Sequence, residues 1–83
     1  AGQSMEGAGL DDGDLLVIDR SLEPEDNKIA VCFVNGEFTV KRLKVAEDGI
    51  WLLPENKNYR PIQINNESEL IVWGIVTHVL KKV

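Results

Sequence analysis

The amino-acid sequence predicts a mostly β domain of short, twisted strands and hairpins with little helix. Short runs rich in β-branched and aromatic residues alternate with clusters of Gly, Asn, Asp and Pro. One pair of these runs is joined by Asn-Gly, the strongest local signal for a hairpin. No window has the apolar periodicity of an amphipathic helix. With 83 residues, 43% of them hydrophobic, we expect residues 1–83 to form one compact domain.

The first predicted strand is the apolar run 15–18, which ends at Asp19. Residues 6–14 precede it and are rich in glycine, which is typical of a turn-rich lead-in. Residues 21–27 follow it and are polar around Pro24, so we expect a loop there.

A β-hairpin is the clearest local prediction. Residues 28–34 and 37–45 are two β-rich runs on either side of Asn35-Gly36. A type I′ turn needs positive φ at both central residues, which Asn and Gly tolerate best. A second tight turn is predicted at residues 47–49.

Three more extended segments complete the prediction. Residues 50–54 form a strand that Pro54 ends, and residues 61–64 form a short extended piece between polar loops. Residues 70–80 form a long β-branched strand. Gly74 interrupts this last strand and indicates either a bulge or a close crossing of chains.

The strand predicted at 37–45 changes its apolar face along its length. Phe38 and Val40 point to one side, whereas Leu43 and Val45 point to the other. Lys41 shares the side of Leu43, so strict alternation places this lysine against the core unless a bulge turns it outward. The alternative is that residues 41–44 form a solvated basic stretch on an edge strand.

Composition and charge limit the classes of partner and cofactor. The chain has 9 Lys and Arg against 14 Asp and Glu, a net charge of −5, whereas nucleic-acid binding needs a concentrated positive face. It has no apolar run of membrane-spanning length and no signal peptide. Cys32 is the single cysteine, and no Cys/His cluster suggests a metal site. We therefore expect a cytoplasmic domain with no metal, no cofactor, no membrane contact and no direct nucleic-acid binding.

Few side chains are candidate nucleophiles. Ser4 lies in a polar, Gly-flanked segment, whereas Ser21 and Ser68 lie in acidic loops without a base nearby in sequence. Cys32 is best interpreted as a small core residue. Any of these serines would need a base to remove its proton.

Two kinds of base are available. His78, the only histidine, could form a triad with Ser4 and either Asp14 or Asp19, because triads assemble in space, but nothing local supports this. Lys41 could act as a base if burial keeps its amine neutral. The other lysines lie in loops, near the ends of the chain or among polar neighbours and are poorer candidates: Lys28, Lys44, Lys57, Lys81 and Lys82.

An acidic cluster precedes the first strand. Asp11, Asp12 and Asp14 surround Gly13 and could suggest calcium binding. The alternating oxygens and the later bidentate Glu of a calcium loop are missing. We therefore interpret the cluster as a turn that enters the strand.

Four segments, in order, match segments of one known family. QSMEGAGLDDGDLLVID and NGEFTVKRL resemble the segments that carry the catalytic serine and lysine of the LexA/UmuD self-cleaving peptidases. LLPENKNYRPIQI and GIVTHVLKK resemble the family's next block and its last strand. The spacing between Ser4 and Lys41 also agrees with the family. The resemblance covers essentially the whole chain.

This resemblance implies a compact peptidase domain in which Ser4 is the nucleophile and Lys41 is the general base. Backbone N–H groups near Ser4 would form the oxyanion hole. The family hydrolyses one peptide bond in its own N-terminal arm, stimulated by the RecA–single-stranded-DNA filament during the SOS response. It also forms homodimers.

Two branches of the family are open. In UmuD-like proteins, which we favour from the ending GIVTHV, the processed form joins a UmuC-type translesion polymerase. In LexA-like and phage repressors a DNA-binding domain precedes the peptidase domain, and LLPEN and VKRLK resemble these as much. The family cuts an Ala-Gly or Cys-Gly bond upstream of the serine, and Ala1-Gly2 lies too close to Ser4 to serve. We therefore expect 1–83 to be a fragment that lacks its N-terminal arm or domain.

Overall fold

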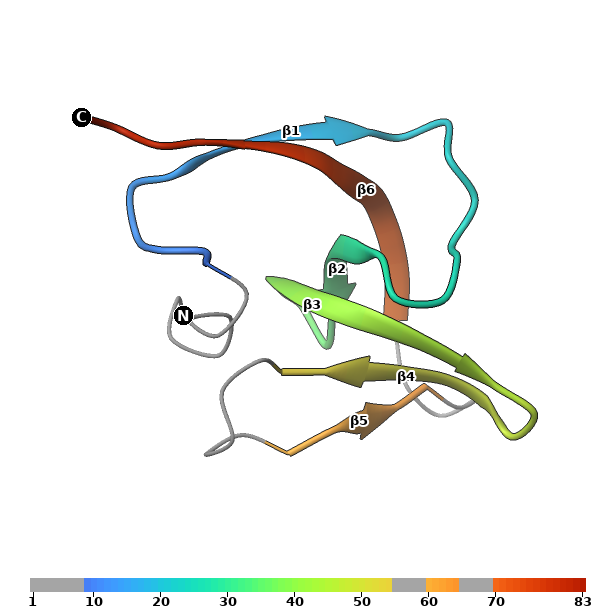
Figure 1. Ribbon diagram of the computed structural model, residues 1–83. Helices are drawn as coiled ribbons and strands as arrows, with labels where there is room; N and C mark the ends of the chain where they lie inside the picture. Colours follow the sequence, from blue (N-terminus) through green and yellow to red (C-terminus); the bar gives the residue numbers. More distant parts are fainter. Residues whose placement is uncertain (1–8, 55–59, 65–69) are drawn as a thin grey trace.

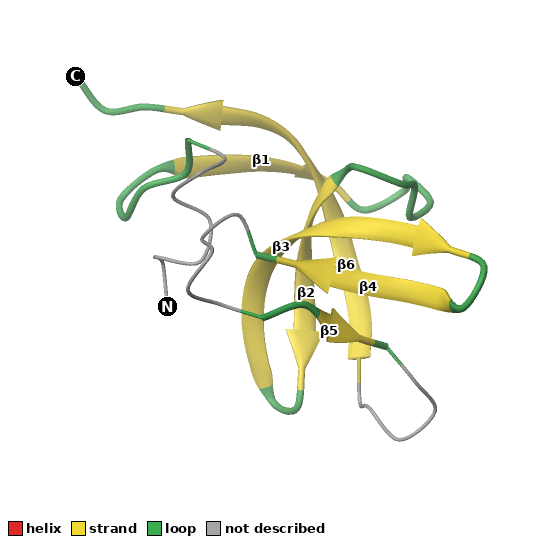
Figure 2. Cartoon of the chain, turned by 60° about the horizontal axis from the view of Figure 1, so that its bottom comes forward, coloured by secondary structure: helices red, strands yellow, loops and turns green. Residues whose placement is uncertain are grey.

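The computed structural model describes residues 9–54, 60–64 and 70–83. These residues form one antiparallel sheet, shown in Figures 1 and 2, and contain no helix and hence none able to cross a membrane. The strands are β1 (Leu15–Asp19), β2 (Ile29–Val34), β3 (Glu37–Ala46), β4 (Gly49–Leu53), β5 (Ile62–Gln63) and β6 (Leu70–Leu80). The prediction of a mostly β domain is confirmed.

The order of the strands in the sheet is β1-β6-β2-β3-β4-β5. Strands β2 to β5 are neighbours in chain order, whereas β6 returns to lie between β1 and β2. Figure 1 shows β6 as the long strand that runs beside β1 and then turns toward β2. Every pair of neighbouring strands is antiparallel.

The predicted hairpin is present between β2 and β3. Val34 pairs with Glu37, which leaves a two-residue loop. In that loop Asn35 has φ 47° and Gly36 has φ 88°, as a type I′ turn requires. The second predicted turn joins β3 to β4, where Ala46 pairs with Gly49.

Gly74 lies where β6 changes direction. The register between β2 and β6 shifts there, because Val31 pairs with Gly74 but Cys32 pairs with Val72. A Cβ atom on Gly74 would clash with Cγ2 of Ile18. Both predicted roles of this glycine are therefore found: it lies beside a bulge and permits a close crossing with the segment of β1.

The core lies on one side of the sheet and draws on four strands. Its buried members are Ala30, Cys32, Leu43, Leu52 and Ile75, with Val34, Ile50, Ile64 and Val72 packed against them. Cys32 is fully buried in this cluster, so its interpretation as a small core residue is confirmed.

Candidate active site

Lys41 lies on the core side of β3 and is only 8% exposed. Ala30, fully buried, lies opposite it on β2, and Leu43, also buried, follows two residues later on the same face. No register shift interrupts the pairing of β3 with β2 or β4. The bulge and the solvated-edge interpretations are therefore both wrong for Lys41, because β3 is an interior strand with regular alternation.

The change of apolar face along β3 has a different cause. Phe38 lies on the outer side of the sheet, where its ring makes an edge contact with Phe33, with centroids 4.9 Å apart. A second edge contact joins Phe38 to Trp73, with centroids 5.9 Å apart. The outer side of the sheet thus has an aromatic cluster of its own. The first half of β3 therefore places its apolar side chains on the outer face, while Lys41 lies on the inner face.

Burial sets the electrostatics around Lys41. The loss of water around its ammonium group lowers the pKa of Lys41, and the charge interaction with Cys32 opposes this shift. Burial likewise raises the pKa of the Cys32 thiol to about 11, despite the nearby lysine. A lysine with a lowered pKa is neutral more often near pH 7 and can then accept a proton.

The other half of the predicted dyad lies outside the described residues. Ser4, the backbone beside it that would form the oxyanion hole, and Ser68 all belong to segments 1–8 and 65–69, which the structure does not describe. The pairing of Ser4 with Lys41 therefore stays a prediction.

The described contacts do not assemble a triad around His78. This residue is exposed, and its Nδ1 lies 3.0 Å from Oγ1 of Thr77. Asp19 instead accepts hydrogen bonds from the backbone N–H of Ser21, at 2.8 Å, and from its hydroxyl, at 2.6 Å. Asp14 is bound to Lys81. Within the described part of the chain, neither carboxylate orients the histidine.

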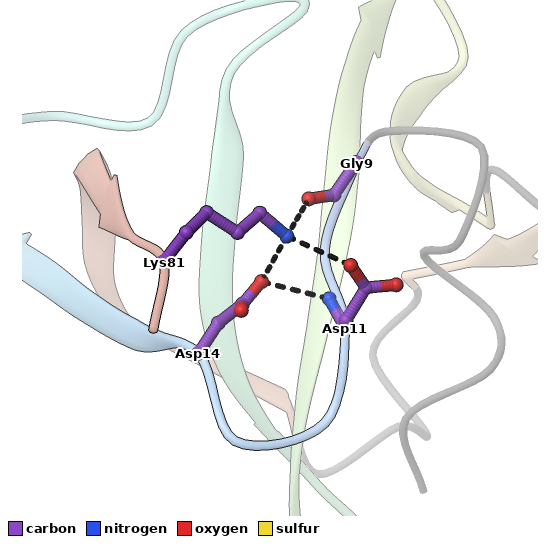
Figure 3. Close-up of polar contacts among 4 residues, drawn as sticks. All are labelled: Gly9, Asp11, Asp14 and Lys81. Atoms are coloured by element: carbon purple, nitrogen blue, oxygen red, sulfur yellow. Dashed lines mark hydrogen bonds and ion pairs between the residues drawn. The ribbon is translucent and has the colours of Figure 1, made fainter. Parts of the chain in front are cut away.

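The acidic turn before β1 is bound by Lys81, a contact that the sequence does not predict. Figure 3 shows Nζ of Lys81 donating to the carbonyl oxygen of Gly9 (2.6 Å), to Oδ2 of Asp11 (2.9 Å) and to Oδ2 of Asp14 (2.5 Å). The interpretation of this segment as a turn is confirmed, since the backbone N–H of Asp14 donates to the carbonyl of Asp11. No local signal could reveal Lys81, because about seventy residues separate it from its partners.

Metal ligands are not gathered in the described residues. Among residues 9–54, 60–64 and 70–83, no three His, Cys, Asp or Glu side chains lie together as a metal site would need. The carboxylates of Asp11 and Asp14 in the acidic turn form ion pairs with the ammonium group of Lys81.

A family comparison gives these observations their context. The Peptidase S24-like family model matches residues 1–77 of the chain. The chain belongs to this family. The resemblance to LexA/UmuD peptidases is thereby confirmed.

Curated relatives with similar sequences carry two names. The LexA repressor of Acidithiobacillus ferrooxidans is 42% identical over 83 residues, covering 96% of this chain and 40% of the repressor. Protein MucA of Salmonella typhimurium is 42% identical over 81 residues, covering 96% of this chain and 55% of that protein. LexA repressor 1 of Pseudomonas putida is 37% identical over 82 residues, covering 98% of this chain and 41% of the repressor. The chain thus spans about half or less of the length of these relatives.

Proposed function

We propose that this chain is the peptidase domain of a UmuD-like SOS-response protein, which cleaves its own N-terminal arm with a Ser4–Lys41 dyad. The observation that carries the proposal is the burial of Lys41 in the core of a chain of the S24 family. A lysine that is this dehydrated has a lowered pKa, which is what a general base for a serine hydroxyl needs. No cofactor or metal takes part.

The reaction follows acyl transfer to serine. The neutral amine of Lys41 takes the hydroxyl proton of Ser4 while the serine oxygen attacks the carbonyl carbon of the substrate peptide bond. Backbone N–H groups near Ser4 stabilise the oxyanion. The ammonium of Lys41 then gives its proton to the leaving nitrogen, and the C–N bond breaks. Water, deprotonated by Lys41, hydrolyses the resulting ester and restores the Ser4 hydroxyl.

The substrate bond lies in sequence upstream of Ser4, and the RecA–single-stranded-DNA filament stimulates its cleavage in the cytoplasm. The processed form then serves as an accessory subunit of a UmuC-type translesion polymerase. One sequence feature favours this assignment, the ending GIVTHV. The net charge of −5 fits either branch, because it disfavours direct phosphate binding only by this domain.

The domain acts as a homodimer, and an exposed apolar surface on the outer side of the sheet supports this. On the outer side, Ile71 and Phe38 are both cross-strand partners of Phe33, and they are 61% and 62% exposed. Trp73 extends the row through its contact with Phe38. Contiguous exposed apolar surface of this kind is typical of protein–protein contacts.

A LexA-like repressor is the second candidate. It is favoured by the 42% identity to a LexA repressor over 96% of the chain, equal to the identity to MucA. In this case the released piece would be a DNA-binding domain rather than a short arm.

The test uses the full-length protein that carries this chain. The wild type and the variants Ser4→Ala, Lys41→Ala and Lys44→Ala are incubated at mildly alkaline pH, with and without RecA filament, and fragments are weighed by mass spectrometry. Lys44 is exposed on the same strand and is the matched control. We expect one cut in the wild type and Lys44→Ala, and none in the other two. Cleavage by Ser4→Ala would refute the dyad, and the mass of the released piece separates the two branches.

A further inference from the structure

Outside the proposed dyad, Lys81 makes three hydrogen bonds to the turn before β1 that the proposed reaction does not explain. We infer that Lys81 is a positioning residue: by binding residues 9–14 it anchors the segment that carries Ser4 to the end of β6. This inference rests on the proposed function, since it assigns Lys81 a role in the reaction of Ser4.

The geometry of the cluster is that of an anchor. A single ammonium group is bound by one backbone carbonyl, on Gly9, and by two carboxylates, on Asp11 and Asp14. The Asp14 side chain is only 9% exposed, and its Oδ2 also accepts the backbone N–H of Asp11 at 2.8 Å. Charge-assisted bonds of this kind are stronger than neutral ones. The whole turn is thus held as a unit against β6.

The anchor holds a stretch of chain that strand pairing does not reach. The ladder between β1 and β6 ends at the pair Leu15 and Leu80, and Lys81 extends the attachment back to Gly9. Gly9 is five residues after Ser4, a tether of at most about 18 Å. With the anchor lost, this stretch is held only by the burial of Leu10, which is 6% exposed, and the next backbone fixed by strand pairing is Leu15, about 40 Å from Ser4 along a fully extended chain. A longer tether lowers the effective concentration of the nucleophile at its base.

Strand β6, which leads to Lys81, also packs beside the residues that surround Lys41. Ala30 on β2 is paired on one side with Lys41 and on the other with Ile75 of β6. All three residues are buried. Ile75 of β6 thus lies in the same cross-strand row as Lys41. Lys81 follows directly after the last residue of β6 and binds the turn that follows the segment of Ser4. The cluster links the two halves of the dyad through one strand.

The test measures self-cleavage of the full-length protein against pH in Lys81→Met, Lys81→Arg and Lys82→Met. Lys82 is the exposed neighbour and the matched control. We expect Lys81→Met to lower the plateau rate at least about tenfold while leaving the pH midpoint, which reports Lys41, unchanged. Lys81→Arg restores most of the rate, and Lys82→Met matches the wild type. Labelling of Ser4 by a fluorophosphonate falls by the same factor in Lys81→Met.

The outcomes separate this inference from the function on which it rests. If the wild type cleaves and labels but Lys81→Met does both at the same rate, the inference is overturned and the proposed function stands. A shift of the pH midpoint in Lys81→Met also overturns it, since Lys81 would then act on Lys41. If the wild type neither cleaves nor labels, the dyad itself is refuted and the inference falls with it.

A second variant covers the case in which Lys81→Met does not fold. Asp11→Ala removes the more exposed of the two carboxylate acceptors, 69% against 9% for Asp14, and leaves the backbone turn in place. We expect it to lower the plateau rate by about threefold with the fold intact by circular dichroism. An unchanged rate would overturn the inference.

Discussion

Lys41 is buried because of its place in the alternation of β3, between the core residue Leu43 and the inward-facing Thr39. A buried ammonium group loses hydration, so folding favours the neutral amine and lowers the pKa of Lys41. In the pH range between its lowered pKa and the ordinary value of 10.5, the unfolded chain binds more protons than the folded one. Burying Lys41 therefore lowers the free energy of unfolding by its full amount below the lowered pKa, and this loss disappears as the pH rises through 10.5.

Lys41→Met is accordingly expected to stabilise the fold at pH 7. Methionine keeps the length of the side chain and removes the charge, and the gain is on the order of 1 kcal/mol. Urea unfolding at pH 7 and pH 10 measures it, and the difference from the wild type should shrink at the higher pH. Lys44→Met, at an exposed site of the same strand, should change little at either pH. A destabilised Lys41→Met would contradict the account of burial.

The rate of self-cleavage should also follow the titration of Lys41. Below its pKa the rate rises about tenfold per pH unit, because only the neutral amine accepts the serine proton, and above it the rate levels off. The midpoint is expected below 10.5. Lys41→Arg should abolish the reaction, because an arginine stays charged at every accessible pH. A rate independent of pH from 6 to 10 would exclude Lys41 as the base.

Strand β6 shows how one element joins two parts of the sheet. It pairs with β2 over its first half and with β1 over its second, and the register shifts in both ladders. Bulges of this kind increase the local bend, which Figure 1 shows as the turn of β6. Gly74 allows the bend because no side chain fills the space beside Ile18.

Gly74→Ala is expected to destabilise the fold by about 1–3 kcal/mol, since the added methyl overlaps Cγ2 of Ile18. Chemical denaturation measures the loss. The double variant with Ile18→Ala should cost less than the sum of the two single changes, because the smaller side chain removes the overlap. Strict additivity would show that the methyl is accommodated elsewhere.

The Lys81 cluster predicts a broad pH window of added stability. Hydrogen bonding to Lys81 lowers the pKa of Asp14, so its contribution is present above the ordinary 3.8 and is lost as the pH falls below it. The same bonds raise the pKa of Lys81, so its contribution is present below 10.5 and is lost as the pH rises beyond it. The difference in melting temperature between wild type and Lys81→Met should be largest from about pH 5 to 10. A difference that stays constant down to pH 2 would contradict the ion pair.

The parts that sequence predicts are those with local causes. The turn at Asn35-Gly36 follows from two residues that tolerate positive φ, and the inward face of Lys41 follows from the period of two along β3. The place of β6 between β1 and β2 is not predictable this way, because it depends on pairing between residues far apart in the chain. The contact of Lys81 with the acidic turn is not predictable for the same reason, because its partners Asp11 and Asp14 lie at the other end of the chain.

At the scale of the whole molecule, the outer aromatic surface bears on assembly. Phe38→Glu places a charge at an exposed site, so the monomer should stay folded while the proposed dimer weakens by at least about tenfold. Sedimentation equilibrium measures the dissociation constant. Leu22→Glu, at an exposed apolar residue of a loop, is the control and should dimerise as the wild type does. If Phe38→Glu dimerises normally, the dimer uses another face.

The central place of β6 also has a consequence for synthesis. A ribosome makes residues 70–80 after every other strand of the described sheet, yet these residues separate β1 from β2. Until they emerge, β1 has no partner strand, and the core around Lys41 lacks Ile75. Contacts between residues this distant in sequence also form slowly. The nascent chain therefore cannot complete the burial of Lys41 before residues 70–80 have been translated.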